Sequence, residues 1–389
     1  MSLPSLLCAD PSALSSIPQQ GSLDRPELHG GEVDAFAEAY GIPRECWLDL
    51  STGINPIAFP VPDLAADYWR RLPDSGLDGW LREAAAGYYG VTDPAHVVPT
   101  PGSQAAIQWL PRLLPESRVA IIGPTYHEHA RSWSEAGHTV IEIETADAMP
   151  ERADVLLCVN PNNPDGRRHE PEALRAIADG RLLVVDEAFA DLTPEISLAG
   201  AVGDGDCVVL RSFGKFFGLA GLRLGFVLAG EPLATRIRDG IGPWAVSGPA
   251  AAIGAVALAD ASWARAARVR LTAAAGRLDG LLMRNGLTIA GGTGLFRLAT
   301  CDRARDLFEH LARAAILVRR FPNRATWLRF GLPADDGGFD QLARALDGWR
   351  PKAGAAQTAS TQSPAQERRR PGPGDPHPLR RSTFAPGLR

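Results

Sequence analysis

The sequence predicts an α/β protein in which a large domain with a mostly parallel sheet is followed by a smaller α+β domain. Two observations support this prediction. Between about residues 100 and 230, short apolar runs alternate with stretches of helical periodicity, as expected for parallel strands covered by helices. After Pro243 the pattern changes to an alanine-rich stretch followed by short strands, which indicates a second domain.

The predicted strands of the large domain are continuously apolar rather than alternating, so we expect both faces of its sheet to be buried. These strands are Val119–Ile122, Thr139–Ile143, Val155–Val159, Leu182–Val185, Val208–Leu210 and Leu224–Leu228. Two intervening segments, Ser103–Leu114 and Glu170–Ala178, have the spacing of helices that cover such a sheet.

In the smaller domain, residues 250–283 indicate two long helices. Short strands follow at Leu295–Leu298, Ile316–Val318 and Trp327–Phe330, with helices at Arg303–Ala315 and Phe339–Trp349. We therefore divide the chain into an N-terminal segment lining the cleft (1–45), a large domain (46–240), a small domain (241–350) and a tail (351–389). The tail is rich in Pro, Ser, Gln and Arg, a composition typical of disorder.

Composition excludes several classes of function. The net charge is −5, but the tail is basic and the remaining residues carry about −10, which argues against nucleic acid as a partner. No apolar run reaches the roughly 18 residues that span a membrane, and the N-terminus lacks a signal-peptide pattern. We therefore expect a cytoplasmic protein with no membrane partner. Its five cysteines lack CxxC spacing and are expected to be reduced.

Lysine is almost absent from the sequence. Of 40 basic side chains only two are lysines, and one of them, Lys352, lies in the tail. Lys215 is therefore the single lysine of the predicted folded part. Only lysine can lose its proton near neutral pH and condense with a carbonyl group, which arginine cannot do. The sequence thus singles out Lys215 as the candidate catalytic residue.

Polar residues follow four of the predicted strands at their carboxyl ends, where open α/β sheets bind ligands. Tyr126, Asn163, Asp186 and Lys215 each lie at or shortly after such an end. Asp186 could pair with the protonated nitrogen of a pyridinium cofactor, Asn163 could donate to its phenolic oxygen, and Tyr126 could stack on its ring.

A phosphate site is predicted close to these residues. The backbone N–H groups at the start of a helix can bind a phosphate, helped by the helix dipole. The residues expected to form this site are Gly102, Ser103, Gln104, Ser212 and Arg223.

The motifs PGSQAA, GPTYHEHA, NPNNPDG, VVDEAF and SFGKFFGLAGLRLG resemble those of the class I/II aminotransferase family, over roughly residues 25–350. This resemblance implies the fold of fold type I transferases. It also implies pyridoxal 5'-phosphate as cofactor, held by Lys215 as a Schiff base, and a homodimer with its site at the subunit interface.

Within that family, four stretches are most similar to the subgroup that decarboxylates L-threonine O-3-phosphate in cobalamin biosynthesis. They begin at His29, Leu48, Gly292 and Leu328. The similarity implies a phosphorylated amino acid as the substrate, converted to (R)-1-amino-2-propanol phosphate. The residues implied at the substrate end of the cleft are His29, Gly30, Asn55, Arg319 and Arg329. Arg329 would grip the carboxylate, a bidentate task suited to guanidinium.

Two alternatives remain open at the level of sequence. An aminotransferase acting on a phosphorylated amino acid such as histidinol phosphate would use similar residues. A non-catalytic, cofactor-binding regulator is the third hypothesis, although such proteins usually carry a fused DNA-binding domain. Phe189, where the family commonly has tyrosine, fits the decarboxylases better. No metal site is expected, because His127 and His129 would face apart on a helix and lack a third ligand.

Overall fold

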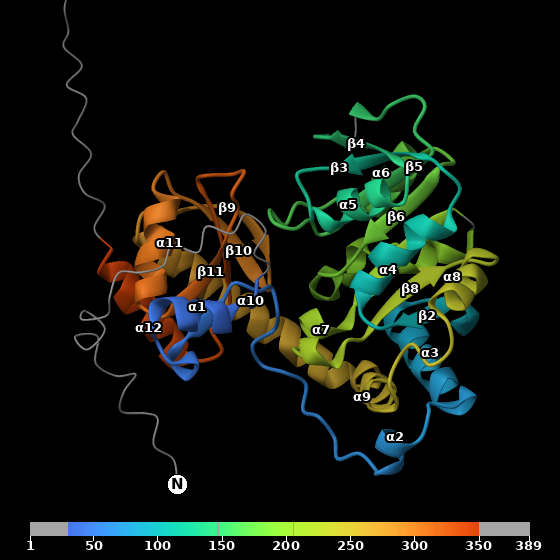
Figure 1. Cartoon of the computed structure of the whole chain (residues 1–389), viewed down its shortest axis with the longest axis horizontal. Coiled ribbons are helices and arrows are strands. Elements are labelled where there is room, and N and C mark those ends of the chain that lie inside the picture. The colour runs from blue at the N-terminus through green and yellow to red at the C-terminus, as the bar shows by residue number, and fades with distance from the viewer. Residues whose placement is uncertain (1–29, 146–147, 205, 350–389) are drawn as a thin grey trace, which may run out of the picture. The chain divides into compact units, whose positions relative to one another are not determined.

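The computed structural model describes residues 30–145, 148–204 and 206–349, and the predicted tail therefore lies outside the described residues. Their strands form two sheets, one of seven strands and one of five (Figure 1). Within these residues, none of the helices combines the length and apolarity that crossing a membrane requires.

The seven-stranded sheet has the order β2-β8-β7-β6-β5-β3-β4. Strands β3 to β7 run parallel, and β8 is antiparallel to both of its neighbours. The mostly parallel sheet predicted from the sequence is therefore confirmed. Its strands are β2 (Val97–Thr100), β3 (Arg118–Ile122), β4 (Thr139–Ile143), β5 (Val155–Val159), β6 (Leu182–Asp186), β7 (Cys207–Ser212) and β8 (Gly225–Ala229).

Both faces of this sheet are buried, as the continuous apolar runs predicted. Along β5, for example, Leu156 and Cys158 belong to one cluster of buried side chains, whereas Val155 and Leu157 belong to another. Successive side chains of a strand point to opposite faces, so the two clusters are the two sides of the sheet. Helices supply the partners on both sides: α3 (Ser75–Tyr89), α4 (Ser103–Trp109), α5 (Glu128–Glu135), α6 (Pro171–Ala178), α8 (Leu233–Ile241) and α9 (Gly248–Ala259).

The five-stranded sheet has the order β1-β11-β12-β10-β9. Its strands are β1 (Leu48–Leu50), β9 (Thr288–Thr293), β10 (Phe296–Thr300), β11 (Ile316–Arg320) and β12 (Trp327–Gly331). The helices of this part are α1 (Val33–Tyr40), α10 (Ala261–Arg284), α11 (Ala304–Arg313) and α12 (Asp336–Asp347). Two short helices, α2 (Asp67–Arg70) and α7 (Phe213–Phe216), lie elsewhere in the chain.

Two segments differ from the predicted division at residues 46 and 241. Strand β1 pairs in parallel with β11, so residues 48–50 belong to the smaller sheet rather than to the large domain. Helix α9 lies beyond the second boundary, yet it packs on the large-domain side, where Gly254 contacts the side chains of Leu81 and Leu224. Both placements depend on partners distant in sequence, which local periodicity cannot reveal.

The cysteines differ in part from expectation. Cys158 and Cys301 are free thiols, as predicted. Cys46 is disulfide-bonded, so the expectation that all five are reduced is wrong for that residue.

Candidate active site

The predicted site residues of the large domain lie at one edge of the seven-stranded sheet. Strands β3, β5, β6 and β7 are parallel neighbours, so their carboxyl ends meet at the same edge. Tyr126 follows β3, Asn163 follows β5, Asp186 ends β6 and Lys215 lies in α7, directly after β7. The fold thus brings together the four residues that the sequence placed at separate strand ends.

Lys215 lies in a short helix whose surroundings favour the neutral amine. Burial, with the nearby Arg329 and Arg223 as smaller causes and Asp186 opposing them, lowers the pKa of its ammonium group to about 8. At pH 7 about a tenth of a lysine with this pKa is the neutral, nucleophilic amine that carbonyl condensation requires, against less than about 0.1% at the usual lysine pKa.

Asp186 is a buried carboxylate that has two fixed partners. Its Oδ2 lies 2.8 Å from Nε2 of the buried His129, and its Oδ1 accepts a hydrogen bond of 3.0 Å from the backbone of Ala188. From the sequence, His129 was assessed only as a metal ligand, so this contact with Asp186 was not predicted. No local pattern signals this contact, because His129 follows β3 and Asp186 ends β6, and β5 lies between these two strands.

The five residues predicted to bind phosphate also gather in one place. Gly102 precedes the first turn of α4, and a β-carbon there would lie 2.5 Å from Nη2 of Arg223. A β-carbon on Gly225 would lie 2.4 Å from the backbone nitrogen of Ser103, and Gly225 pairs with Ser212 across the sheet. The absence of side chains at both glycines therefore leaves backbone nitrogen, hydroxyl and guanidinium groups close together.

Gln104 connects this region to Tyr126. The Tyr126 hydroxyl donates to Oε1 of Gln104 at 3.2 Å, and Nε2 of Gln104 donates to Glu128 at 3.1 Å. Burial, with the Glu128 charge as a smaller cause, raises the pKa of Tyr126 to about 12, so its hydroxyl keeps its proton. The Gln104 side chain thus fixes the orientation of the Tyr126 ring.

Two arginines of the smaller sheet complete the site. Arg329 on β12 is 7% exposed, and it donates to Oδ1 of Asn163 at 2.6 Å and to the carbonyl of Ser51 at 2.9 Å. Arg319 lies opposite it on β11. Burial lowers the pKa of both guanidinium groups, and the charge of Arg319 lowers the pKa of Arg329 further. Among the described residues the Nε atom of Arg329 has no hydrogen-bond partner, so this site can accept an anion.

The remaining predicted substrate residues are placed differently. His29 lies outside the described residues. Gly30 packs on Ser51, where a β-carbon would lie 2.5 Å from the carbonyl oxygen. Asn55 holds the turn that carries Lys215, because its backbone nitrogen donates to the Lys215 carbonyl and its amide donates to Phe216, both at 2.8 Å.

Phe189 packs between the two parts of the site. Its ring meets Phe296 of β10 edge-to-face, with centroids 5.0 Å apart, and lies 6.0 Å from Nζ of Lys215. On another side it contacts Gly53, where a β-carbon would lie 3.0 Å from the ring. Because phenylalanine has no hydroxyl group, Phe189 supplies shape but no hydrogen bond here.

A buried charge cluster that the sequence analysis did not predict lies directly behind Asp186. Arg211 pairs with Glu187 at 2.6 Å and with Asp191 at 3.0 Å, and all three side chains are at most 3% exposed. Glu187 also accepts hydrogen bonds from Ser197 and from the backbone of Leu198. No local pattern signals this pairing, because Arg211 on β7 lies 24 residues after Glu187.

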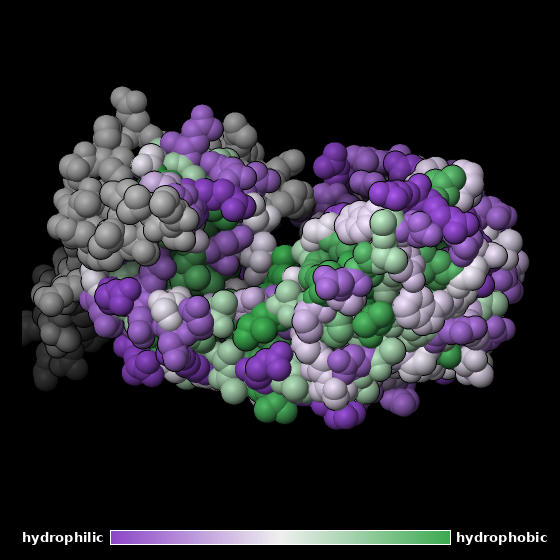
Figure 2. All heavy atoms as spheres, turned by 90° about the horizontal axis from the view of Figure 1, so that it is seen from below, coloured by the Kyte–Doolittle hydropathy of each residue, from purple (hydrophilic) through white to green (hydrophobic). Residues whose placement is uncertain are grey.

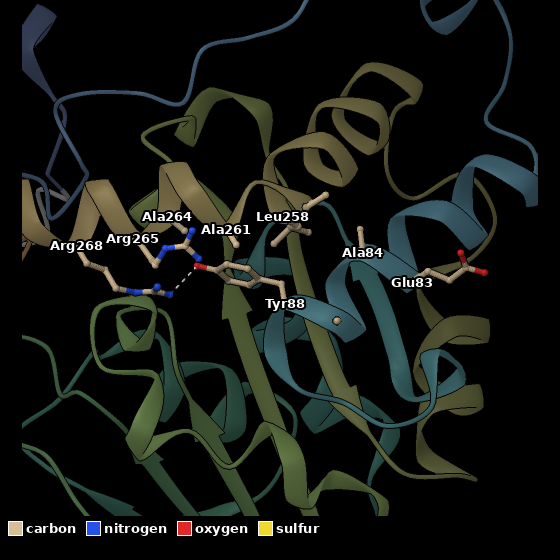
Figure 3. Close-up of a pocket in the computed structure, with 10 residues that line it drawn as sticks. Glu83, Ala84, Tyr88, Leu258, Ala261, Ala264, Arg265 and Arg268 are labelled. Carbon is tan, nitrogen blue, oxygen red and sulfur yellow. Dashed lines mark hydrogen bonds between the residues drawn. The ribbon is translucent and has the colours of Figure 1, made fainter.

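A cavity of about 440 Å³ lies apart from these residues, between α3 and the start of α10 (Figure 3). The predicted site residues do not line it. Arg268 donates across it to the Tyr88 hydroxyl at 3.4 Å and to the Asp191 carbonyl at 2.7 Å. The guanidinium of Arg268 also lies over the ring of Phe216, so Arg268 stabilises the turn that carries Lys215.

The fold and the site define an α/β protein with a buried, partly deprotonated lysine beside a carboxylate, facing two arginines. The chain belongs to the class I and II aminotransferase family, whose model matches residues 55–346.

Two curated relatives named threonine-phosphate decarboxylase are similar over nearly their whole length. The protein from Sinorhizobium sp. is 49% identical over 83% of this chain and 98% of its own. The protein from Pseudomonas aeruginosa is 47% identical over 84% and 98%. Among solved structures, L-threonine-O-3-phosphate decarboxylase from Porphyromonas gingivalis has the same fold, with a TM-score of 0.66 and 21% identity over 77% of this chain and 98% of that one.

Proposed function

We propose that this chain is a pyridoxal-phosphate-dependent decarboxylase that converts L-threonine O-3-phosphate to (R)-1-amino-2-propanol phosphate and carbon dioxide, in cobalamin biosynthesis. The observation that carries the proposal is the identity of almost half the residues with two proteins of that name, over 98% of their lengths. The geometry of the site supports it, because a reactive lysine and an anion-binding arginine converge.

The residues at the sheet edge fit pyridoxal phosphate. Asp186, held as a buried carboxylate by His129, would pair with the protonated ring nitrogen, and Lys215 would hold the cofactor covalently. Asn163 would donate to the phenolic oxygen and Tyr126 would stack on the ring. The space left by Gly102, beside Ser103, Gln104, Ser212 and Arg223, would hold the phosphate. When bound, this cofactor accepts the electrons of a bond broken at the substrate Cα.

The two arginines would bind the two anionic groups of the substrate. Arg329 would hold the carboxylate through two contacts, and Arg319, opposite it on β11, would attract the phosphate. By fixing the carboxylate, Arg329 would decide which bond at Cα breaks. Lys215 would then deliver a proton to Cα after carbon dioxide leaves. His29, Gly30 and Asn55 remain candidate contacts at this end of the cleft.

The same proposal includes a homodimer. The face of the molecule in Figure 2 carries apolar groups among polar ones. In addition, several large apolar side chains between residues 57 and 72 are more than 40% exposed. They are Ile57, Val61, Trp69 and Leu72. Large exposed apolar side chains that are this close together in the chain would suit an interface between subunits. Sedimentation of the purified protein would test this: a monomer at micromolar concentration would contradict it.

Product analysis tests the proposed reaction. With threonine phosphate and pyridoxal phosphate, the purified protein should release carbon dioxide and aminopropanol phosphate without any 2-oxo acid. The control omits the cofactor, and a parallel reaction contains 2-oxoglutarate. If the protein makes no aminopropanol phosphate but converts histidinol phosphate only with 2-oxoglutarate present, it is an aminotransferase.

A further inference from the structure

Three glycines meet where the turn after β5 touches β9. Gly166 ends the turn that begins at Asn162, while Gly291 and Gly292 lie in β9. A β-carbon on Gly166 would lie 2.1 Å from the carbonyl oxygen of Gly292, and one on Gly291 would lie 2.0 Å from that of Asp165. The two segments therefore touch backbone to backbone, and no side chain fits between them.

Neither segment can easily yield. The turn is closed by hydrogen bonds of 2.8 Å from Gly166 to Asn162 and from Asn162 to Arg167, and the Asp165 carboxylate accepts two more. On the other side of the contact, β9 is held closely against β10, because a β-carbon on Gly292 would lie 2.4 Å from the Phe296 carbonyl. Because both backbones are held, a side chain added at the contact must separate them.

This contact is linked directly to the site. Gly291 pairs with Leu298 on β10, and Leu298 pairs with Arg329 on β12, so the three residues form one row across the sheet. At the other end of the same turn, Asn163 accepts the 2.6 Å hydrogen bond from Arg329. A movement of β9 away from the turn would therefore also draw Arg329 away from Asn163.

We propose that Gly166, Gly291 and Gly292 are positioning residues whose contact sets how closely Arg329 approaches Asn163 and Lys215. This inference rests on the proposed function, in which Arg329 holds the substrate carboxylate. A displacement of about 1 Å in a group that orients the substrate is enough to lower the rate of reaction about 100-fold. The glycines would thus fix which bond at Cα faces the cofactor, without touching the substrate.

The test compares two alanine substitutions with nearly equal backbone strain. Gly166 has φ of +71° and Gly180 has φ of +75°, but a β-carbon on Gly180 meets nothing within 4 Å. Gly180→Ala should lower the melting temperature by a few degrees because of its φ alone, and Gly166→Ala should lower it by more because its β-carbon also meets backbone. Only Gly166→Ala should raise KM about tenfold or more and increase the transamination product relative to decarboxylation. Both variants should keep the visible absorbance of the bound cofactor.

A second measurement does not depend on turnover. In the protein without cofactor, hydrogen exchange of residues 160–169 and 288–298 should accelerate at least several-fold in Gly166→Ala and stay unchanged in Gly180→Ala. Gly291→Ala adds a β-carbon to the same contact from the β9 side. It is the variant to use if Gly166→Ala does not fold. Its control is Gly286→Ala, where a β-carbon also meets nothing within 4 Å.

The outcomes separate this inference from the proposed function. If Gly166→Ala matches Gly180→Ala in KM, product ratio and exchange, the glycines do not position Arg329 and the inference is overturned. If the wild type fails to decarboxylate threonine phosphate, the proposed function fails. The exchange comparison and the kinetics with whichever amino acid the wild type accepts still decide the role of the glycines.

Discussion

The two sides of the site are built in different ways. On the large-domain side, Tyr126, Asn163, Asp186 and Lys215 reach one sheet edge because consecutive parallel strands end there. On the small-domain side, Arg329 is held by hydrogen bonds to Asn163 and Ser51, which lie 166 and 278 positions earlier in the chain. Local chain order thus builds the large-domain side of the site, whereas the small-domain side depends on long-range contacts.

The two sides also differ in charge balance. On the large-domain side the buried charges have partners: Asp186 contacts His129, and Arg211 is shared between Glu187 and Asp191. The small-domain side holds Arg319 and Arg329 close together without a carboxylate bonded to either in the described part of the chain. Its positive charge is therefore available for an anionic substrate.

Loss of Lys215 should have the largest effect of any single change. Lys215→Ala removes the amine that would hold the cofactor and move the proton at Cα, so activity should fall by at least about 10³-fold. The visible absorbance of the lysine-bound cofactor should disappear. Lys352→Ala, which removes the other lysine of the chain, is the matched control and should leave the activity and the absorbance unchanged. An active Lys215→Ala variant would exclude this residue from catalysis.

The buried charge cluster should dominate the stability of the large-domain side. Glu187→Ala leaves Arg211 with one buried partner instead of two, at a cost of about 3 kcal/mol, or roughly 150-fold in the unfolding equilibrium. Denaturant unfolding without cofactor would measure it. Asp34→Ala, which breaks an exposed pair with Arg44, is the control and should change little. Equal effects of the two substitutions would show that the cluster is not stabilising.

On the small-domain side, Arg329→Lys should lower kcat/KM about 50-fold although the charge is retained. Lysine cannot contact Asn163, Ser51 and a carboxylate in the planar geometry of guanidinium. The substrate carboxylate would then rotate, so the share of transamination product should rise. Separating the products with and without 2-oxoglutarate measures this share. A variant with lower rate but an unchanged product ratio would mean that Arg329 binds substrate without orienting it.

The sequence predicted the large-domain side better than the small-domain side. The strands Thr139–Ile143 and Val155–Val159 were predicted to the residue, because buried parallel strands are continuously apolar. Strand β9 was missed because its Gly291 and Gly292 weaken any strand signal, and β2 because of Pro99. Partners such as His129 for Asp186 could not be predicted, since pairing between distant segments leaves no local pattern.

A final prediction connects the two sides through the pKa of Lys215. Only the neutral amine condenses with the aldehyde of the cofactor, and the lysine pKa is lowered to about 8. The rate at which the cofactor-free protein takes up pyridoxal phosphate should therefore rise about tenfold from pH 7 to pH 9 and then level off, as the absorbance change would show. A free lysine derivative, the control, should keep accelerating beyond pH 10. Because the nearby Arg329 charge lowers this pKa, Arg329→Gln should move the midpoint of the protein curve to higher pH. An unchanged midpoint would show that Arg329 does not lower the pKa of Lys215, and that the two sides of the site act independently.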